Sequence, residues 1–416
     1  MSLEFDYQKL GSISDVKGGK RLPKGHSLIN IPNSHPYIKV KDMAPDKLLK
    51  LTDNFEYIEN ETFNEISHYI VNKGDLIISI VGTIGLTNII EYSLDNANLT
   101  ENCAKITNLK KGYNVDYIYY FLNSNIGQNL IQESTVGAVQ KKLPIKNIRD
   151  LNIPFPNFDI QNKIVDLLST IDKKIENCKS INKNLQNLIK ILYKEYFESF
   201  ELDNVPDDWE LVNIGSIIDI YNGYSYKGTE LQESDCGMVT IKNFNRDGSF
   251  RIDGFKEIVY SNKIKKHHFI NENDVLISCT DVTQDADIIG NCIIVLDKQN
   301  YDELIMSMDL VKIESKISEI NNFLLASIFK SYNFKKHILG YVNGTTVLHL
   351  DKKGIKKFKI ALPKDLSELK NISERFELIY AEIQCNQKEI NKLTKLRDTL
   401  LPKLMSGEID VSKIEM

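Results

Sequence analysis

Residues 159–200 read DIQNKIVDLLSTIDKKIENCKSINKNLQNLIKILYKEYFESF, and this stretch determines how the whole chain is organised. It contains no proline or glycine, and its apolar side chains recur at steps of three and four residues. That spacing is typical of one apolar stripe along a long helix. At about 1.5 Å per residue the helix would be roughly 60 Å long, beyond the usual globular length, so its stripe needs a partner. The stripe consists of Ile160, Ile164, Leu167, Ile171, Ile175, Cys178, Ile181, Leu185, Leu188, Leu192 and Tyr196.

A partner lies at the far end of the chain, in residues 365–405, where the same apolar period returns. The two stretches match when they are shifted by about 208 positions, which aligns Ile164 with Ile372 and Leu188 with Leu396. We therefore predict a duplicated long helix whose two copies pack together as a coiled coil. The residues expected to pair the helices are Ile164, Ile171, Ile175, Leu185, Ile379, Ile383, Leu393 and Leu400.

Antiparallel packing of the two helices is the expected arrangement, because a parallel pair would require the second half of the chain to double back. It would also place the two globular parts toward opposite ends of a helical rod. Asn386 falls at a position where the second stripe otherwise carries an apolar residue. A buried Asn can fix the register of paired helices. A fraying or solvent-facing Asn is the open alternative.

The segments that precede the two helices are duplicated as well. Leu10–Ile13 corresponds to Ile214–Ile217, and each is followed by a polar loop that contains glycine. The other matched segments read as a short strand, a turn into a buried strand, a helix, a polar glycine loop, and a strand that ends in proline. In that order they are 37–42 with 238–243, 73–79 with 273–278, 117–130 with 321–339, 136–142 with 342–347, and 151–156 with 358–363.

The repeat unit of about 205 residues is too long for a solenoid, so we interpret the chain as a tandem duplication of one globular domain and one long helix. Each globular half mixes short strands with a few helices and lacks a regular βαβ alternation, which predicts an α+β fold. The linker 203–208 marks the join. The predicted boundaries are 1–157 for the first globular domain, 158–202 for the central helix, 203–363 for the second domain, and 364–416 for the C-terminal helix and tail.

The composition is that of an ordinary soluble protein, with 416 residues, 42% hydrophobic, 26% charged and a net charge of −5. It contains no run of 18 apolar residues, and its start lacks the features of a secretory signal, so we expect no membrane association and a cytoplasmic location. The six cysteines are scattered and form no C-x-x-C pair, which favours reduced thiols over disulfides or zinc. An acidic net charge still permits a local basic face.

Motifs for catalysis are absent from the sequence. It contains no P-loop, no H-E-x-x-H, no G-x-S-x-G, no Rossmann fingerprint and no amino-methyltransferase tetrapeptide. Gly82-Thr83-Ile84-Gly85 after a strand resembles part of a nucleotide loop but is interpreted as a turn. His267-His268 lies in a lysine-rich segment and is interpreted as a solvated basic turn. We therefore expect neither a catalytic nor a metal site in this chain.

Basic clusters with polar and aromatic neighbours recur at equivalent places in the two halves. Loops that follow strands and carry Lys, Gln, Thr and Tyr suit both phosphate contacts and base-edge readout. Arginine is the most frequent reader of guanine, and the chain has few arginines, so those in these loops stand out. The candidate DNA-binding residues are Lys17, Lys20, Arg21, Lys24, Lys41, Gln140, Lys141, Tyr224, Tyr226, Lys227, Lys242, Arg246, Arg251, Thr345 and Thr346.

Three segments carry a family resemblance. The strand–proline–helix junction from Leu151 through Gln161 to Asp172, and the segment 73–79 with Gly82 and Gly85 after it, resemble those of type I restriction–modification specificity subunits (HsdS-like). The ending 396–409, LRDTLLPKLMSGEI, is the most specific match. The resemblance covers the whole chain and its duplication. The second half departs from it at 365–368, which lacks the usual Gln, and at 278–290, which lacks the paired glycines.

This resemblance implies a function as well as a fold. Each globular half would be a target recognition domain that reads one half of a bipartite DNA sequence, and the helices would set the spacer between the half-sites. The subunit would have no active site. It would bind double-stranded DNA together with two methyltransferase (modification) subunits and two restriction (translocase–endonuclease) subunits. The partners, not this chain, would use S-adenosylmethionine, ATP and Mg²⁺ for adenine-N6 methylation and cleavage.

Two alternatives remain open at the level of sequence. A scaffold protein could display two protein-binding domains on the same helical rod, and the acidic composition permits this. An enzyme with an unrecognised site is the third reading. Under the leading interpretation, the loops of the two halves differ, so we expect an asymmetric DNA target.

Overall fold

The computed structural model describes residues 5–43, 46–138, 140–199, 204–283 and 285–413. It consists of two compact units, one formed by residues 1–174 with 392–416 and the other by residues 175–391. Each unit therefore combines one globular domain with part of both long helices. Phe200, at the end of the predicted helical stretch, and Asp203, at the start of the predicted linker, lie outside the described residues.

The first unit is built on a five-stranded sheet of order β2-β9-β6-β7-β4 and a three-stranded sheet of order β5-β3-β8. A two-stranded ribbon, β1 with β10, leads into helix α6. Buried aliphatic residues of β6 and β9 pack against the aromatic helix α3 to form the main core. The strands are β1 (Asp6–Lys9), β2 (Asp15–Gly18), β3 (Pro36–Ile38), β4 (Leu48–Leu49), β5 (Glu56–Tyr57), β6 (Leu76–Ser79), β7 (Thr87–Ile90), β8 (Asn98–Leu99), β9 (Cys103–Thr107) and β10 (Asn152–Phe155), and the helices are α1 (Leu10–Ile13), α2 (Asn60–Ile66), α3 (Val115–Asn123), α4 (Asn125–Glu133), α5 (Ile145–Arg149) and α6 (Phe158–Phe197).

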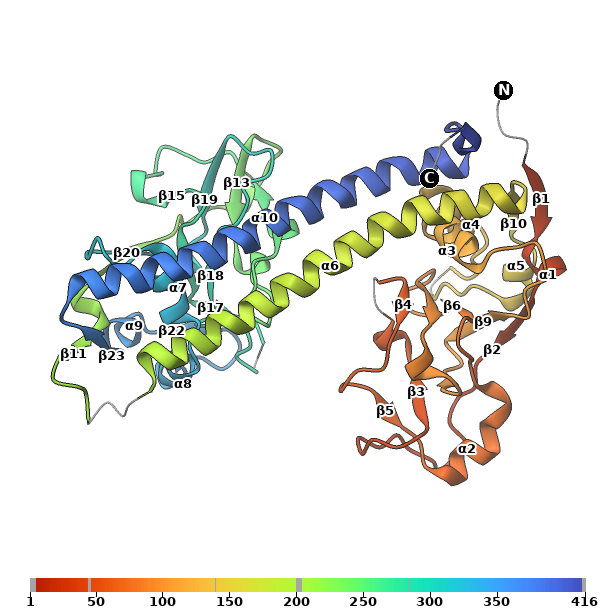
Figure 1. The fold of residues 1–416 in the computed structure, drawn as a ribbon, viewed down its shortest axis with the longest axis horizontal. Helices are drawn as coiled ribbons and strands as arrows, with labels where there is room; N and C mark the ends of the chain where they lie inside the picture. Colours follow the sequence, from red (N-terminus) through yellow and green to blue (C-terminus); the bar gives the residue numbers. More distant parts are fainter. Residues whose placement is uncertain (1–4, 44–45, 139, 200–203, 284, 414–416) are drawn as a thin grey trace. The chain divides into compact units, whose positions relative to one another are not determined.

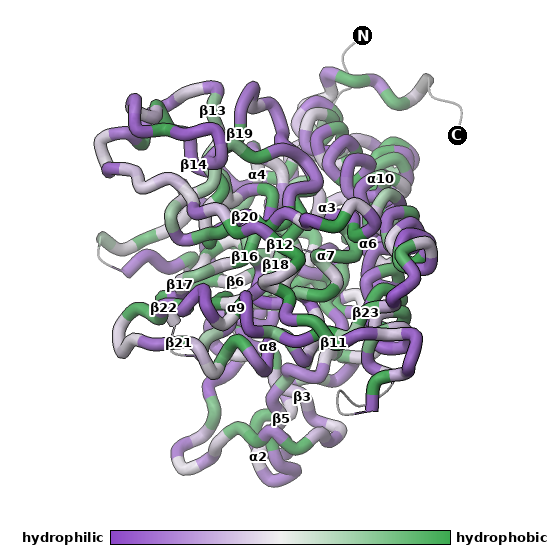
Figure 2. Tube along the Cα trace, turned by 90° about the vertical axis from the view of Figure 1, so that its left-hand side faces the viewer, coloured by the Kyte–Doolittle hydropathy of each residue, from purple (hydrophilic) through white to green (hydrophobic). Residues whose placement is uncertain are grey.

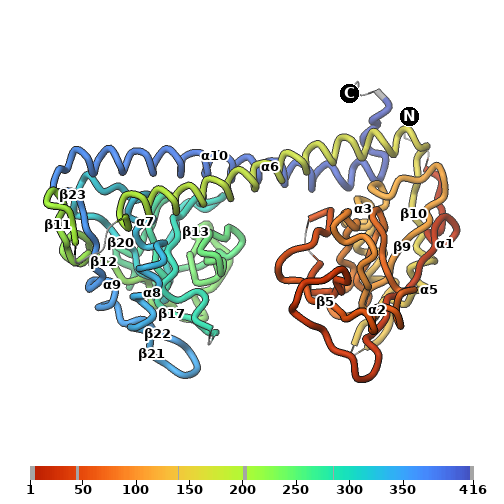
Figure 3. The backbone as a smooth tube through the Cα atoms, turned by 60° about the horizontal axis from the view of Figure 1, so that its bottom comes forward, coloured from red at the N-terminus to blue at the C-terminus, as the bar shows by residue number. Residues whose placement is uncertain are grey.

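The second unit repeats this plan. Its sheets have the orders β12-β20-β16-β18 and β14-β13-β19-β15, and β11 with β23 forms the ribbon before α10. A third sheet, β17-β22-β21, lies at the end of this unit that faces away from the paired helices (Figure 3). The strands are β11 (Trp209–Asn213), β12 (Ile218–Asn222), β13 (Cys236–Val239), β14 (Lys256–Glu257), β15 (Phe269–Ile270), β16 (Val275–Ser278), β17 (Thr280–Asp281), β18 (Cys292–Ile294), β19 (Glu303–Met306), β20 (Leu310–Ser315), β21 (Val342–Asn343), β22 (Leu348–Leu350) and β23 (Lys359–Pro363), and the helices are α7 (Asn322–Phe329), α8 (Tyr332–Leu339), α9 (Lys353–Lys357) and α10 (Leu366–Met405).

The long helices α6 and α10 each span 40 residues and pack antiparallel within each unit (Figure 1). In the second unit Asn182 contacts Asn386, and Tyr196 accepts a hydrogen bond from Arg375. In the first unit Arg397 donates to Asp172 at 3.1 Å, while Leu404 shares a core with Ile164. Residue numbers thus fall along α10 as they rise along α6, which confirms the α+β tandem repeat with two antiparallel helices.

Most of the predicted seam is buried. Ile164, Ile171, Ile175 and Ile383 are at most 8% exposed, while Leu185, Ile379 and Leu400 are partly buried against the cores. Leu393 is also partly buried. Hydrophobic and hydrophilic residues accordingly alternate along both helices (Figure 2).

Two members of the predicted stripe are exposed instead, namely Ile181 at 37% and Leu188 at 40%, and so is Leu396, which the repeat aligns with Leu188, at 45%. The expectation that the partner helix covers the whole stripe was wrong at these positions, because two paired helices bury a narrower arc than the whole stripe. Asn386 is only 9% exposed and donates to Asn182 Oδ1 at 3.0 Å, so the buried alternative for Asn386 is the correct one.

Two other predictions need correction. The single helices predicted at 117–130 and 321–339 are each broken in two, because Ser124 and Ser331 cap a second helix by accepting the backbone N–H of Gly127 and Phe334. The strands predicted at 37–42 and 238–243 end early in 3-10 turns, η1 (Val40–Asp42) and η6 (Ile241–Asn243).

Candidate nucleic-acid interface

A glycine fixes the start of the candidate surface in each half. After β2 the chain crosses β8 at Gly19, where an added Cβ would lie 2.0 Å from the carbonyl oxygen of Thr100. After β12 it makes the same crossing at Gly223, where a Cβ would lie 1.9 Å from the carbonyl oxygen of Ser307. Only glycine permits this approach. The residues that follow, Lys20-Arg21 in the first half and Tyr224 in the second, are placed by these crossings.

In the first unit, Arg21 lies where two adjoining grooves meet. One groove is lined by Lys41 of the turn η1 and by Lys39, which precedes it, and the other by Gln140 and Lys142. The structure therefore brings together three regions that the sequence nominated separately, represented by Arg21, Lys41 and Gln140. Lys20 lies beside Arg21 in the chain, with its ammonium 5.5 Å from the centre of the Tyr69 ring.

Carboxylates hold the basic groups of this surface. The Nε of Arg21 donates to Glu101 at 2.7 Å, although the Arg21 side chain is 81% exposed. Burial raises the pKa of Glu101, but hydrogen bonds led by that from Arg21 bring it below its usual value, so Glu101 is ionised. An exposed ion pair adds little stability. The Arg21–Glu101 pair instead orients the guanidinium, since contact at Nε leaves Nη1 and Nη2 available to a ligand.

Glu56 acts in the same way on the turn η1. Lys41 Nζ lies 2.7 Å from the Glu56 carboxylate, and Lys39 also contacts it. Burial lowers the pKa of Lys39 to about 8. The backbone N–H of Lys39 donates to Asp42, which fixes the turn. The exposed group of the pair is Lys41, whose side chain is 63% exposed.

In the second unit, the equivalent turn η6 carries the exposed Lys242, and Arg246 and Arg251 follow it. Arg251 donates through Nε and Nη2 to Asp253 at 2.6 and 2.9 Å, so its guanidinium is already used within its own loop. Arg246 is different. Its side chain is 77% exposed, and its Nε lies 3.5 Å from the carboxylate of Asp287. Arg246 thus resembles Arg21 in geometry and Arg251 does not.

A glycine turn completes the surface in each half. Val136 and Lys142 bridge each other, Lys142 also bridges Val81, and Gly137 has a φ of 103°. In the second half β21 pairs with β22, β22 pairs with β17, and Gly344 has a φ of 120°. The turns expose the predicted residues Gln140, Lys141, Thr345 and Thr346. Val139, within the first turn, lies outside the described residues.

Comparison with known proteins places the chain in a family. The type I restriction modification DNA specificity domain matches residues 3–187 and again residues 206–395. The chain belongs to the type I restriction–modification specificity-subunit family. The MjaIX and MjaVIII specificity subunits of Methanocaldococcus jannaschii are each 24% identical to it, over 99% and 95% of this chain and 95% and 96% of their own lengths. The crystal structure of a type I system S subunit from M. genitalium shares the fold, with a TM-score of 0.58, 16% identity, and coverage of 97% of this chain and 96% of that one.

Several nominated residues of this specificity subunit lie away from the grooves. Lys17 pairs with Asp15 on β2 at 3.3 Å, and Lys24 is exposed on a neighbouring turn. Lys227 is exposed, and Tyr226 lies beneath the ammonium of Lys256, 5.6 Å from the ring centre.

Tyr224 and His268 differ from expectation. The Tyr224 side chain is 1% exposed, and its hydroxyl bonds to Glu230 and Ser261, so it supports the loop from inside and offers no atom to a ligand. The interpretation of His267-His268 as a solvated turn was wrong for His268. The turn forms, but His268 is 8% exposed, and its Nδ1 accepts the backbone N–H of Lys265. Tyr224 packs against this ring, which explains the burial of both.

Sequence reasoning missed the acidic partners. Glu56, Glu101 and Asp287 lie far along the chain from the basic groups they hold, and no spacing pattern signals such a pairing. The arginines outside the candidate loops are structural. Arg149 donates to the carbonyl of Val16, Arg375 to the Tyr196 hydroxyl, and Arg397 to Asp172.

Among the described residues, no group of three or more His, Cys, Asp or Glu side chains is arranged to hold a metal ion. None of the helices in the described part of the chain is long and apolar enough to cross a membrane.

Proposed function

We propose that this specificity subunit is the non-catalytic DNA reader of a type I restriction–modification complex, and that each globular domain reads one half of an asymmetric bipartite target. The observation that carries the proposal is the repeated surface. One backbone frame, with a glycine crossing, a 3-10 turn and a glycine turn, presents different side chains in the two halves. A frame that stays constant while its exposed side chains change is suited to two different base sequences.

The chemistry of the side chains supports a reader without a reaction of its own. Burial raises the pKa of Cys103, Cys279 and Cys292 to about 12, so these thiols are neutral and poor nucleophiles at neutral pH. The exposed groups of the candidate surface are lysines, arginines, amides and hydroxyls, which bind phosphate and base edges. Adenine-N6 methylation and DNA cleavage are then reactions of the methyltransferase and restriction subunits, which use S-adenosylmethionine, ATP and Mg²⁺.

The paired helices would set the spacer between the two half-sites and dock the methyltransferase subunits. Their duplication supports this, because it offers two equivalent faces for two copies of one partner. Such a complex would contain two methyltransferase and two restriction subunits. In the isolated chain we expect weak DNA binding, and in the complex tight binding that falls steeply with salt.

The test is methylation of a DNA library by the complex reconstituted with its methyltransferase subunit. The library carries two random half-sites separated by spacers of several lengths. The expected product is one bipartite motif with one spacer length, and gel-shift titration should show salt-sensitive binding to it. Methylation or binding that ignores DNA sequence would refute the proposal and favour a protein-binding scaffold. Methyl transfer by the isolated chain would favour an unrecognised enzyme.

A second experiment tests the spacer role. Residues 180 and 388 lie opposite each other on the two helices, two positions from Asn182 and Asn386, so a four-residue insertion at both sites lengthens the pair with its helical phase nearly kept. The insertion adds about 6 Å to each helix. At about 3.4 Å per base pair this corresponds to a spacer longer by roughly two base pairs. An unchanged spacer preference would show that the helices do not set the spacer.

A further inference from the structure

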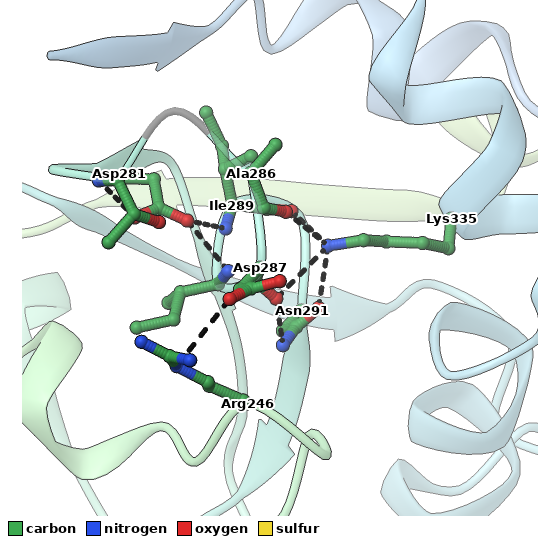
Figure 4. A network of polar contacts seen from close by, with 9 residues as sticks. Arg246, Asp281, Ala286, Asp287, Ile289, Asn291 and Lys335 are labelled. Atoms are coloured by element: carbon green, nitrogen blue, oxygen red, sulfur yellow. Dashed lines mark hydrogen bonds and ion pairs between the residues drawn. The ribbon is translucent and has the colours of Figure 1, made fainter. Parts of the chain in front are cut away.

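The segment between β17 and β18 in the second unit is held by two charges of opposite sign, the buried carboxylate of Asp281 and the half-buried ammonium of Lys335 (Figure 4). Its described residues are 282–283 and 285–291. The fully buried Asp281 accepts the backbone N–H of Ile288 at 2.7 Å and that of Ile289 at 3.2 Å through Oδ2. Its other oxygen accepts from Thr283. One end of the segment is therefore folded around a carboxylate.

The ammonium of Lys335 on α8 donates hydrogen bonds to the carbonyls of the same segment. Its Nζ donates to the carbonyl of Ile289 at 2.6 Å, to that of Ala286 at 3.2 Å and to Asn291 Oδ1 at 2.8 Å, and Asp287 O lies at 3.5 Å. Burial lowers the pKa of Lys335, while the carboxylates of Asp281 and Asp287 act in the opposite direction. Ala286 has a φ of 53°, a left-handed conformation that a non-glycine residue holds only when its surroundings fix it. The Lys335 bond to its carbonyl is such a constraint.

In the first half, no charged side chain at this position holds the equivalent segment. The equivalent residue on α4 is Gln128, which reaches one loop carbonyl, that of Gly85, at 3.1 Å. There the connection after β6 is shorter and turns at Gly82 and Gly85, both with positive φ. The longer connection of the second half keeps only Gly290 at the position of Gly85. Its extra residues, which include Asp287, are the part that Lys335 fixes.

Asp287 points from this segment to Arg246. The Asp287 carboxylate lies 3.5 Å from Arg246 Nε (Figure 4). The backbone of Arg246 is itself fixed in a tight turn, in which Asn245 donates its backbone N–H to the carbonyl of Ser249 and its side-chain amide to the Ser249 hydroxyl. With one anchor at the backbone and one at Nε, Nη1 and Nη2 remain for a ligand. These two donors match the paired acceptors O6 and N7 of guanine.

We propose that Arg246 reads a guanine in the second half-site, and that Lys335 is the positioning residue that aims it, through the β17–β18 segment and Asp287. This rests on the proposed function. Because the device occurs in one half only, Lys335 should affect one half-site and leave the other as an internal control.

The experiment uses the reconstituted methyltransferase complex and DNA libraries in which one half-site at a time is random. The wild-type complex should prefer guanine at one position of the second half-site. Arg246→Ala should reduce that preference by about 10- to 100-fold, the range for loss of one bidentate base contact. Lys335→Met and Asp287→Ala should reduce this guanine preference as well. If Lys335→Met fails to fold, Lys335→Gln, which has the side chain of the equivalent Gln128, takes its place in the assay. Lys336→Met, an exposed neighbour on the same helix, is the matched control and should change nothing.

A double variant separates positioning from general destabilisation. If Lys335 acts through Arg246, Lys335→Met should add nothing to Arg246→Ala at the guanine position, and the first half-site should keep its preference in every variant. A guanine preference retained by Lys335→Met, or an equal loss at both half-sites, overturns the inference alone. A wild-type complex with no bipartite preference overturns the proposed function and this inference with it.

Discussion

The amide pair Asn182–Asn386 predicts a strong energetic coupling between the two long helices. The structure buries both side chains, at 7% and 9% exposure, and joins them by one hydrogen bond of 3.0 Å. Asn182 also donates to the carbonyl of Ile383 at 3.3 Å. Asn386→Leu removes the bond between the amides, worth about 1 kcal/mol net, and leaves Asn182 Oδ1 buried without its donor, at a cost of about 1–3 kcal/mol. Burial of the leucine returns roughly 1.5–2 kcal/mol. The single variant should therefore be about 1 kcal/mol less stable than wild type.

The double variant Asn182→Leu/Asn386→Leu should recover this loss, because no amide is left unpaired. The coupling energy from the double-mutant cycle should be about 1–3 kcal/mol. The assay is urea unfolding of the four proteins, followed by circular dichroism. The positions related to this pair by the repeat are Cys178 and Ile390, which are buried and apolar, so Cys178→Val/Ile390→Leu is the matched control with coupling near zero. Additive effects at the two asparagines would refute the reasoning.

A functional result should accompany the coupling. Because its counterpart in the repeat is apolar, the polar layer breaks the internal symmetry of the helix pair, and one buried Asn pair can specify register at some cost in stability. The double leucine variant should therefore be at least as stable as wild type but should accept a wider range of DNA spacers in the methylation assay. A variant with an unchanged spacer range would show that register is set elsewhere.

Other predictions concern single residues. Arg21→Ala should relax the base preference at one position of the first half-site by about 10-fold or more, whereas Arg251→Ala, whose guanidinium is used by Asp253, should have little effect in the same library assay. Gly19→Ala should destabilise the first unit by about 3 kcal/mol, because its Cβ would lie 2.0 Å from a backbone oxygen, and thermal unfolding should show this. Asp281→Asn should lower the stability of the second unit by about 2 kcal/mol at pH 7. Burial raises the pKa of Asp281, but the backbone bonds it accepts bring it below its usual value, so its stabilising charge is present above about pH 4. The difference from wild type should shrink as the pH falls below that value.

The long helices and the duplicated frame could be predicted because their signals are local and periodic. A stripe at steps of three and four residues specifies a helix, and Gly19 with Gly223 marks a crossing that only glycine permits. The break of the shorter helices at Ser124 was missed because a capping serine within an apolar run also reads as an ordinary helical residue.

The details of the site could not be predicted, because they depend on contacts between distant parts of the chain. Arg21 and Glu101 are 80 residues apart, and Lys335 meets Ala286 across 49. Tyr224 was placed on the surface because an aromatic residue after a glycine looks the same whether it supports a loop or stacks on a base. Only the tertiary structure shows that Glu230 and His268 enclose it.

Under the proposed function, the pattern of charge would allow one backbone frame to recognise two different base sequences. The elements that repeat are backbone features, namely the crossings at Gly19 and Gly223 and the turns η1 and η6. The elements that differ are ion pairs placed on that frame, Arg21 with Glu101 in one half and Arg246 with Asp287 in the other. An exposed ion pair contributes little to stability, so it can change without unfolding the domain. It does fix the direction of a guanidinium, and direction is what base recognition requires. Exchange of such pairs should therefore alter specificity at almost no cost in stability. Changes to the glycine frame should instead lower stability and leave specificity almost unchanged.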